Sequence, residues 1–187
     1  MPVFIRIENI DGTRLSGVRM RDCVAELTGL FAGKLFTQQQ DMAPFLTDSR
    51  GMWHGNALAV ALPDTVGDVA RIIRWCQDHD VPVVPQGGNT GLSGAATPDK
   101  TGRSIVLSLV RLNCIRGIDK FNDTMVVEAG CLLQNIQDAA RAADRLFPLS
   151  LAAEGSCTIG GTWPRMQAGP RCCATAMRAI CASDWKW

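Results

Sequence analysis

The feature that most constrains this chain is a long, uncharged, glycine-rich loop that directly follows an apolar segment. Val81–Pro85 is short and apolar, as a buried strand is, and the run Pro85-Gln-Gly-Gly-Asn-Thr-Gly-Leu-Ser-Gly-Ala-Ala-Thr-Pro98 follows at once. Glycines let a backbone approach a ligand closely, and successive N–H groups form a concave nest for phosphate oxygens. A solvated loop of this length normally carries charges, so the loop predicts a cofactor cradle rather than a surface turn.

Two common phosphate-binding motifs are absent from this loop. No Gly-Lys-Ser/Thr follows it, so it is not the P-loop of a nucleoside triphosphatase. The Gly-x-Gly-x-x-Gly spacing of the dinucleotide-binding fold is missing, and the loop does not open directly into a helix.

The segments around the loop predict an α+β domain, because strands and helices alternate but a hairpin interrupts the alternation. Thr65 followed by Asp68 has the spacing of a capping box at a helix N-terminus. Residues 36–50 are polar and predict a connecting loop or a short helix, and residues 1–20 predict a short edge strand or an extension. The expected helices are 22–31, 65–79 and 131–145, and the expected strands are 57–62, 81–85, 104–109, 115–118 and 124–128.

A second glycine-containing segment lies at Pro148-Leu-Ser-Leu-Ala-Ala-Glu-Gly-Ser-Cys-Thr-Ile-Gly-Gly161. Taken alone, it is equally typical of a helix-to-strand connection. Together with the first loop, it predicts two backbone walls around one extended cofactor that carries phosphate.

Three motifs occur in the order and spacing of a known family: Pro85-Gln-Gly-Gly-Asn-Thr-Gly-Leu, Val126-Val-Glu-Ala-Gly-Cys131 and Gly155-Ser-Cys-Thr-Ile-Gly-Gly161. They resemble the FAD-binding domain of the vanillyl-alcohol oxidase type, within it most closely the D-lactate, glycolate and D-2-hydroxyglutarate dehydrogenase group. The resemblance covers about Leu46 to Gly161 and implies the N-terminal portion of such a domain, incomplete at its C-terminus.

The resemblance implies non-covalent FAD, since the first loop has no histidine to attach the flavin and Cys157 is expected to be a buried thiol. Amides of Gly87 to Gly91 would hold the pyrophosphate, with Asn89 and Thr90 supporting the loop. Residues of the second segment would line the flavin side. The cofactor-binding residues expected on this basis are Pro85, Gly87, Gly88, Asn89, Thr90, Gly91, Gly94, Pro148, Gly155, Ser156, Thr158, Gly160 and Gly161.

The implied activity is oxidation of a small-molecule 2-hydroxyacid to the 2-oxoacid, with no catalytic residue in this chain. The alternative is a non-catalytic, truncated remnant with weak or no FAD binding. A phosphate-binding regulatory module on another fold is disfavoured, because both glycine segments agree with one family. Neither the hydroxyacid, the electron acceptor nor the oligomeric state follows from the sequence.

Other residues that could be mistaken for catalytic groups have ordinary structural explanations. His54 could approach the cofactor, but a structural role is at least as well supported. His79 ends a predicted helix, where an imidazole favours the C-terminal dipole. Trp75 is expected in the core or at an interface, and Glu128 and Glu154 do not form a credible acid/base pair.

The tail, residues 162–187, departs from the family pattern, which continues with Asn-Leu, Asn-Ala-Gly-Gly and Leu-Arg-Tyr-Gly. Permissible codons with one base restored after Gly161 yield that continuation, and the chain as it stands has no tyrosine. We therefore expect an out-of-frame tail. The expected organisation is an N-terminal extension and lead-in helix (1–45), a partial FAD-binding domain (46–161) and this tail.

Charge and composition limit the partners and the location. The net charge of +1 gives no reason to expect nucleic acid. No apolar run approaches the roughly 20 residues of a membrane span, and Arg6 and Glu8 interrupt any signal-peptide core. We expect a cytoplasmic protein, or one peripheral to the membrane. The eight cysteines include no Cys-x-x-Cys pair, which favours reduced thiols and no metal.

Overall fold

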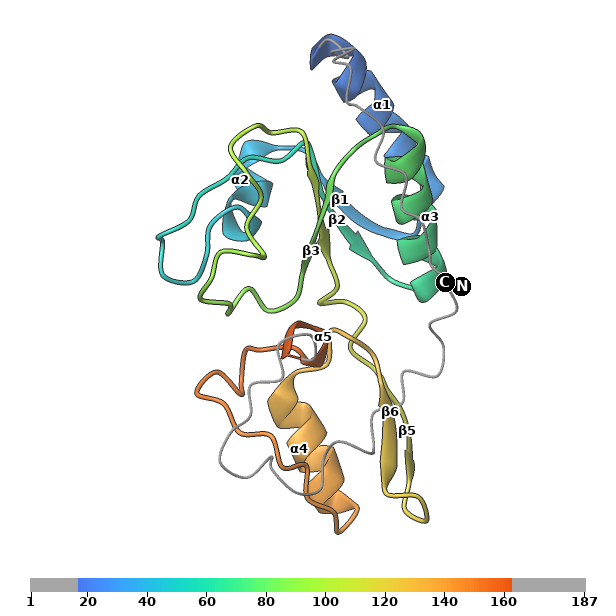
Figure 1. Ribbon diagram of the computed structural model, residues 1–187. Helices are drawn as coiled ribbons and strands as arrows, with labels where there is room; N and C mark the ends of the chain where they lie inside the picture. Colours follow the sequence, from blue (N-terminus) through green and yellow to red (C-terminus); the bar gives the residue numbers. More distant parts are fainter. Residues whose placement is uncertain (1–16, 163–187) are drawn as a thin grey trace, which may run out of the picture.

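The molecule consists of two lobes, the first above the second in Figure 1, and the short helix α5 (Ile159–Thr162) lies where they meet. The computed structural model describes residues 17–162. The predictions for the N-terminal extension before residue 17 and for the tail beyond Thr162 lie outside the described residues. Mixed helices and strands confirm the predicted α+β class.

The first lobe is built on a four-stranded sheet in the order β1-β2-β4-β3. The two inner strands, β2 and β4, are buried at every position, which explains why their sequences are continuous apolar runs rather than alternating ones. β2, β4 and β3 are mutually parallel, whereas β1 pairs antiparallel with β2. The strands are β1 (Gly33–Phe36), β2 (Ala59–Pro63), β3 (Val83–Gln86) and β4 (Ile105–Ser108).

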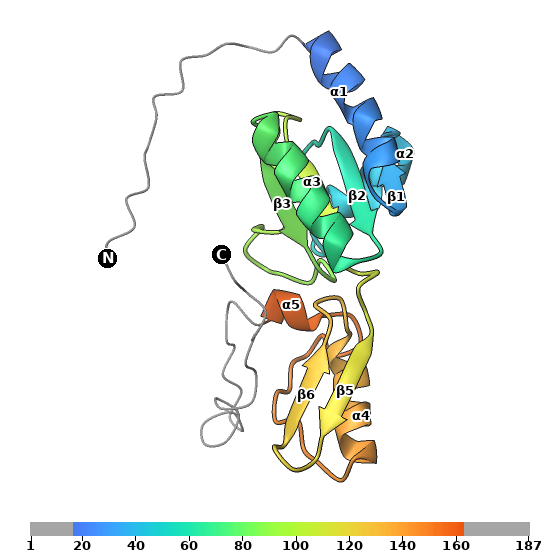
Figure 2. The ribbon, with the colours of Figure 1, turned by 90° about the vertical axis from the view of Figure 1, so that its right-hand side faces the viewer.

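Helices cover both faces of this sheet (Figure 2). On one face, α1 (Gly17–Leu30) and α3 (Val66–Asp78) close a core that includes Leu27, Ile72 and Ile105, each fully buried. On the other face, α2 (Gln39–Met42) and the 3-10 turn η1 (Ala43–Phe45) cover Val60 and Val106. Trp75 belongs to the first core, as predicted.

The predicted capping box at the start of α3 is confirmed. The Asp68 N–H donates to Thr65 Oγ1 at 3.1 Å, and the Thr65 N–H donates to Asp68 Oδ2 at 3.0 Å. Asp68 is fully buried and also accepts from the Ala32 N–H at 3.1 Å and from Arg71. The hydrogen bond from the Thr65 hydroxyl, followed by those from Arg71 and Ala32, holds the pKa of Asp68 below its usual value. One carboxylate therefore ties α3 to the turn between α1 and β1.

The second lobe is thinner: a hairpin of β5 (Ile115–Asp119) and β6 (Thr124–Val127) against α4 (Leu133–Ala142). Its core consists of Cys131, Ile136 and Ile159, with half-buried hydrophobic residues around them. The predicted hairpin and helix are confirmed, with boundaries that differ by one to three residues.

Two parts of the first lobe differ from expectation. The sequence did not predict β1, whose four residues are at most half-buried and pair only with the edge of β2. The stretch expected to be a loop or a short helix, residues 36–50, contains both α2 and η1. Residues 33–45 thus form part of the first lobe's sheet and its cover.

Candidate functional site

A cavity of about 610 Å³ lies between the two glycine segments. One wall is the loop after β3, from Pro85 to Ala96, called the phosphate loop below. The other wall is formed by residues 151–162, with Leu109, which follows β4, and Ala129, which lies between β6 and α4. Segments about 70 residues apart in the chain thus face one another across a single space, as the two-wall prediction requires.

Most of the predicted cofactor-binding residues lie around this cavity. Those that line it are Pro85, Gly87, Gly88, Asn89, Thr90, Gly91, Thr158, Gly160 and Gly161. Ser156 lines a smaller cavity instead, while Gly94, Pro148 and Gly155 line neither. Gly94 has a different function in the structure, because it packs against the ring of Trp53.

Gly87 and Gly88 are the points at which the two walls touch. A Cβ on Gly87 would lie 2.1 Å from Thr158 Oγ1, and a Cβ on Gly88 would lie 1.9 Å from the Ser156 carbonyl oxygen. At Gly88 the clash is with backbone, so any larger residue would force the walls apart, whereas at Gly87 it is with the Thr158 side chain. Gly91 differs, since a Cβ there would meet nothing within 4 Å. The first two glycines therefore hold the walls together, whereas Gly91 faces open space.

Gln86, which the sequence did not single out, fixes both ends of the phosphate loop. Its side chain is 2% exposed, and its Nε2 donates to the carbonyl oxygens of Phe45 at 2.9 Å and Ala96 at 2.8 Å. A buried amide with both N–H groups bonded holds its partners at defined positions. No local pattern could have revealed this, because Phe45 is 41 residues away.

Asn89 holds the middle of the same loop. Its backbone has φ +53°, a left-handed conformation that asparagine tolerates better than most residues. Its Nδ2 donates to the Thr47 carbonyl oxygen at 2.7 Å, so the side chain points away from the cavity and into the protein. This geometry is that of a supporting residue.

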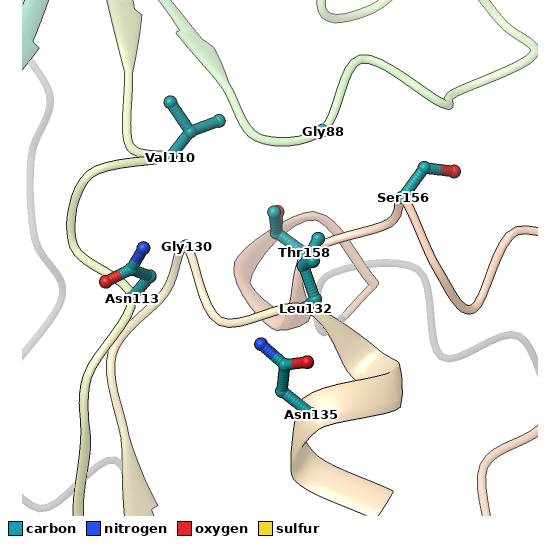
Figure 3. A pocket seen from close by; sticks show the side chains of 8 residues that line it. All are labelled: Gly88, Val110, Asn113, Gly130, Leu132, Asn135, Ser156 and Thr158. Carbon is teal, nitrogen blue, oxygen red and sulfur yellow. The ribbon is translucent and has the colours of Figure 1, made fainter.

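A smaller cavity, of about 260 Å³, shares Gly88 and Thr158 with the larger one and is also lined by Ser156 (Figure 3). The amides of Asn113 and Asn135 extend toward it from the start of the hairpin region and from α4, respectively. Its remaining lining residues are Val110, Gly130, Leu132 and Thr158.

Thr158 borders both cavities and carries an unpartnered polar atom. Its side chain is 2% exposed, and its Oγ1 has no hydrogen-bond partner among the described residues. A buried hydroxyl left unbonded costs roughly 1–3 kcal/mol. Such an atom, at the wall of a cavity, suits a ligand that can accept or donate a hydrogen bond there.

None of the residues lining either cavity is charged. Negative charge in the larger cavity would therefore be stabilised by backbone N–H dipoles and hydroxyls rather than by lysine or arginine. Cys157, 3% exposed, lies in the wall, and burial raises the pKa of its thiol. It is therefore a neutral, buried thiol at physiological pH, as predicted.

Glu128 and Glu154 do not line either cavity, and each has hydrogen-bond partners of its own. Glu128 accepts from the Cys114 N–H at 2.9 Å and pairs with Arg116 at 2.8 Å, which lowers its pKa. The pKa of Glu154 is lowered mainly by the Ser150 hydroxyl.

Within residues 17–162, no group of three or more His, Cys, Asp or Glu side chains is placed to hold a metal ion. No helix in that range has the length and apolarity to cross a membrane.

Comparison with known proteins identifies the family of this domain. The profile of the FAD-binding domain family matches residues 57–183, more than half of the chain. This chain belongs to the FAD-binding domain family. The match confirms FAD as the cofactor of this domain. It also extends past Gly161, where we expected the resemblance to end, and the reading frame of the tail stays a prediction.

Among curated proteins, the chain is 40% identical over 128 residues to the D-2-hydroxyglutarate dehydrogenase of Xanthomonas citri pv. viticola, covering 68% of this chain and 27% of that one. It is 32% identical over 140 residues to the mitochondrial D-2-hydroxyglutarate dehydrogenase of Bos taurus, covering 75% and 25%. The chain thus spans about a quarter of the length of these relatives.

Solved structures share the fold at lower identity. An alkyldihydroxyacetonephosphate synthase matches with a TM-score of 0.67 and 18% identity, over 75% of this chain and 28% of that one. A p-cresol methylhydroxylase with substrate bound matches with a TM-score of 0.64 and 20% identity, over 79% and 30%. The predicted vanillyl-alcohol-oxidase type of domain is confirmed.

Proposed function

We propose that this chain binds FAD non-covalently between its two glycine segments, as the cofactor-binding part of a flavoenzyme that oxidises a 2-hydroxyacid to the 2-oxoacid. The observation that carries the proposal is the larger cavity itself, which is uncharged, walled by glycine backbone and bordered by the unpartnered Thr158 hydroxyl. The hydroxyacid is proposed from the similarity to D-2-hydroxyglutarate dehydrogenases.

The described residues would bind and orient the cofactor. Amides of Gly87 to Gly91 would hold the pyrophosphate, with Asn89 and Thr90 keeping the loop in shape. On the opposite wall, Thr158 and Gly160 would line the flavin side, and Leu109 and Ala129 would exclude water between the walls. The chemistry that a bound flavin would supply is acceptance of a hydride from the substrate carbon that bears the hydroxyl. No described residue is assigned to take the hydroxyl proton.

Non-covalent attachment rests on the absence of a nucleophile in the phosphate loop. Residues 85–98 contain no histidine, cysteine or tyrosine. Cys157 is the thiol of the opposite wall, and its raised pKa disfavours the reactive thiolate. Protein denatured in acid is expected to release all of its flavin into the supernatant.

A cytoplasmic location and an out-of-frame tail are further parts of the proposal. The charged N-terminal residues Arg6, Glu8 and Asp11 support the location. The three tryptophans and three cysteines of residues 162–187 support the altered frame, since nothing in the family pattern calls for them. Resequencing the gene decides the second point: codons that cannot be reread as the family continuation would refute it.

A second candidate is a chain that binds FAD weakly or not at all and oxidises nothing. It is favoured by one observation: Cys157 is the only titratable side chain among the described residues that line the larger cavity. The described residues around this cavity therefore supply no acid or base for the hydroxyl proton.

The test is the visible absorbance spectrum of the purified chain, before and after incubation with FAD and desalting. Retained flavin bands support a cofactor site, and a colourless protein that releases added FAD supports the second candidate.

The Gly91→Asp variant makes this test more specific. A side chain fits at Gly91 without contact, so the variant should fold, but its carboxylate would repel the pyrophosphate and abolish retention. Gly91→Asn, of the same size and neutral, is the matched control and should retain far more flavin.

A further inference from the structure

The segment Leu46–Asn56, called the brace below, lies against the outer side of the phosphate loop and precedes the residues that the family profile matches. Its two ends form a small antiparallel turn. The Asp48 N–H donates to the Trp53 carbonyl oxygen at 3.1 Å, and the Gly55 N–H donates to the Leu46 carbonyl oxygen at 2.9 Å. In Figure 1 it is the loop after α2 that runs beside the loop after β3.

A buried carboxylate holds this turn closed. Asp48 is 4% exposed, and its Oδ1 accepts from the Trp53 N–H at 2.8 Å. That bond is the largest cause of the lowered pKa of Asp48. The turn fixes the backbone of Trp53, and thereby the point from which its half-exposed indole ring reaches Gly94.

The brace contacts the phosphate loop at three successive points. Asn89 Nδ2 donates to the Thr47 carbonyl oxygen at 2.7 Å, and Arg50 Nη2 donates to the Leu92 carbonyl oxygen at 3.1 Å. The indole of Trp53 packs on the backbone of Gly94, where an added Cβ would lie 2.9 Å from the ring. Gly94 has φ +72°, a conformation that side chains rarely adopt.

Two more contacts continue along the chain beyond the phosphate loop. A Cβ on Gly55 would lie 1.9 Å from the Pro98 carbonyl oxygen, and the Asn56 N–H donates to the Asp99 carbonyl oxygen at 2.7 Å. The brace therefore follows the loop from Asn89 to Asp99, while none of its own residues lines either cavity.

We infer that the brace positions the phosphate loop for its ligand, and that Trp53 is the main positioning residue. A glycine-rich loop loses much conformational entropy when it is ordered. Contacts that order it before binding remove that cost from the binding step. This inference rests on the proposed FAD site and adds that part of the cofactor affinity resides outside the matched family residues.

The experiment compares Trp53→Ala, Trp53→Phe and a control in the full chain. If Trp53→Ala leaves about a tenth of the molecules with a competent loop, the FAD dissociation constant rises about tenfold. Trp53→Phe keeps a ring over Gly94 and is expected to restore most of the affinity. Phe121→Ala removes an aromatic side chain that is fully exposed at the tip of the β5–β6 hairpin, and it should change nothing. Flavin fluorescence titration measures the affinities.

Amide hydrogen exchange without FAD gives a readout that does not depend on the cofactor. Trp53→Ala should accelerate exchange in residues 87–94 and leave β2 and β4 protected, as a general loss of structure would not. Unchanged exchange in the loop, or acceleration spread equally over the sheet, overturns the inference. Unchanged FAD affinity with faster loop exchange overturns it too. Wild-type protein that never binds FAD refutes the proposed function, and the exchange result then still decides whether the brace orders the loop.

Discussion

The two lobes contribute to one site with very different structural support. The first lobe has a sheet covered on both faces, and its phosphate loop is fixed by Gln86, Asn89 and the brace. The second lobe has a hairpin, one main helix and a small core around Ile136. Its wall of the cavity meets the first lobe where the Thr158 side chain approaches Gly87 and the Ser156 backbone approaches Gly88.

The two walls of the cavity are therefore stabilised by different means. Burial of apolar side chains, which contributes roughly 25 cal/mol per Å², stabilises the sheet that carries the first wall. The second wall depends on close backbone approach and on whatever occupies the cavity between the lobes. We therefore expect the cofactor to stabilise the second lobe more than the first.

The largest effect should come from the core of the first lobe. Ile72→Ala removes a fully buried side chain between α3 and the sheet and should lower the free energy of unfolding by about 3–4 kcal/mol. Ile136→Ala in the second lobe, 1% exposed, should cost about 2 kcal/mol because less structure surrounds it. Urea unfolding by circular dichroism measures both, with the half-exposed Ile73→Ala on α3 as the control. Equal losses from Ile72 and Ile136 would remove the distinction between the lobes.

The next effect concerns the contact between the lobes. Gly88→Ala places a Cβ about where the Ser156 carbonyl oxygen lies, so the walls must separate. We expect the FAD dissociation constant to rise about a hundredfold, which corresponds to about 2.7 kcal/mol. The same titration with Gly91→Ala, where a Cβ meets nothing, should give nearly wild-type affinity. Wild-type affinity in Gly88→Ala would show that the lobes adjust freely.

A smaller effect concerns the buried Asp68 carboxylate, which ties α3 to the turn between α1 and β1. Because the folded-state pKa of Asp68 lies below its ordinary 3.8, its carboxylate stabilises the fold above that pH, and the contribution is lost as the pH falls through the folded pKa. Asp68→Asn should cost about 2 kcal/mol at pH 7 and flatten the acid dependence of unfolding. The exposed Asp78→Asn serves as the control. An unchanged acid profile in Asp68→Asn would assign acid sensitivity to other carboxylates.

The smallest effect concerns the Thr158 hydroxyl, whose removal should stabilise the free protein but weaken cofactor binding. Thr158→Val removes an unpartnered buried hydroxyl, so the free protein should gain up to about 1 kcal/mol of stability. FAD affinity should fall about tenfold if that hydroxyl bonds the cofactor. Thermal unfolding with and without FAD measures both, and Thr158→Ser, which keeps the hydroxyl, should resemble the wild type. Lower stability in both states would make the hydroxyl structural.

Much of the fold followed from local patterns. The apolar runs of β2 and β4, the Thr65–Asp68 capping box and the amphipathic α3 were all predicted, because their causes lie within a few neighbouring residues. β1 was missed because its partners in β2 lie 24 to 30 residues further along the chain and its own residues are at most half-buried.

The candidate site was predicted in outline but not in detail. The two glycine segments were expected to face one cofactor, and they line one cavity. The sequence could not show that Gly94 packs on Trp53, or that Pro148 and Gly155 lie away from both cavities. A glycine that faces a ligand and a glycine that faces a neighbouring ring look the same in a sequence.

The sequence alone predicts the two glycine segments, the uncharged character of the first of them, their order, and most of the helices and strands that carry them. Those features depend only on residue type and short-range spacing, so they do not depend on how the chain packs. Three properties became clear only from the fold: which glycines hold the walls together, that Gln86 anchors both ends of the phosphate loop, and that the Thr158 hydroxyl has no partner among the described residues. These properties arise from contacts between segments some 40 to 70 residues apart, such as Asn89 with Thr47 and Gly87 with Thr158, and packing alone brings them together.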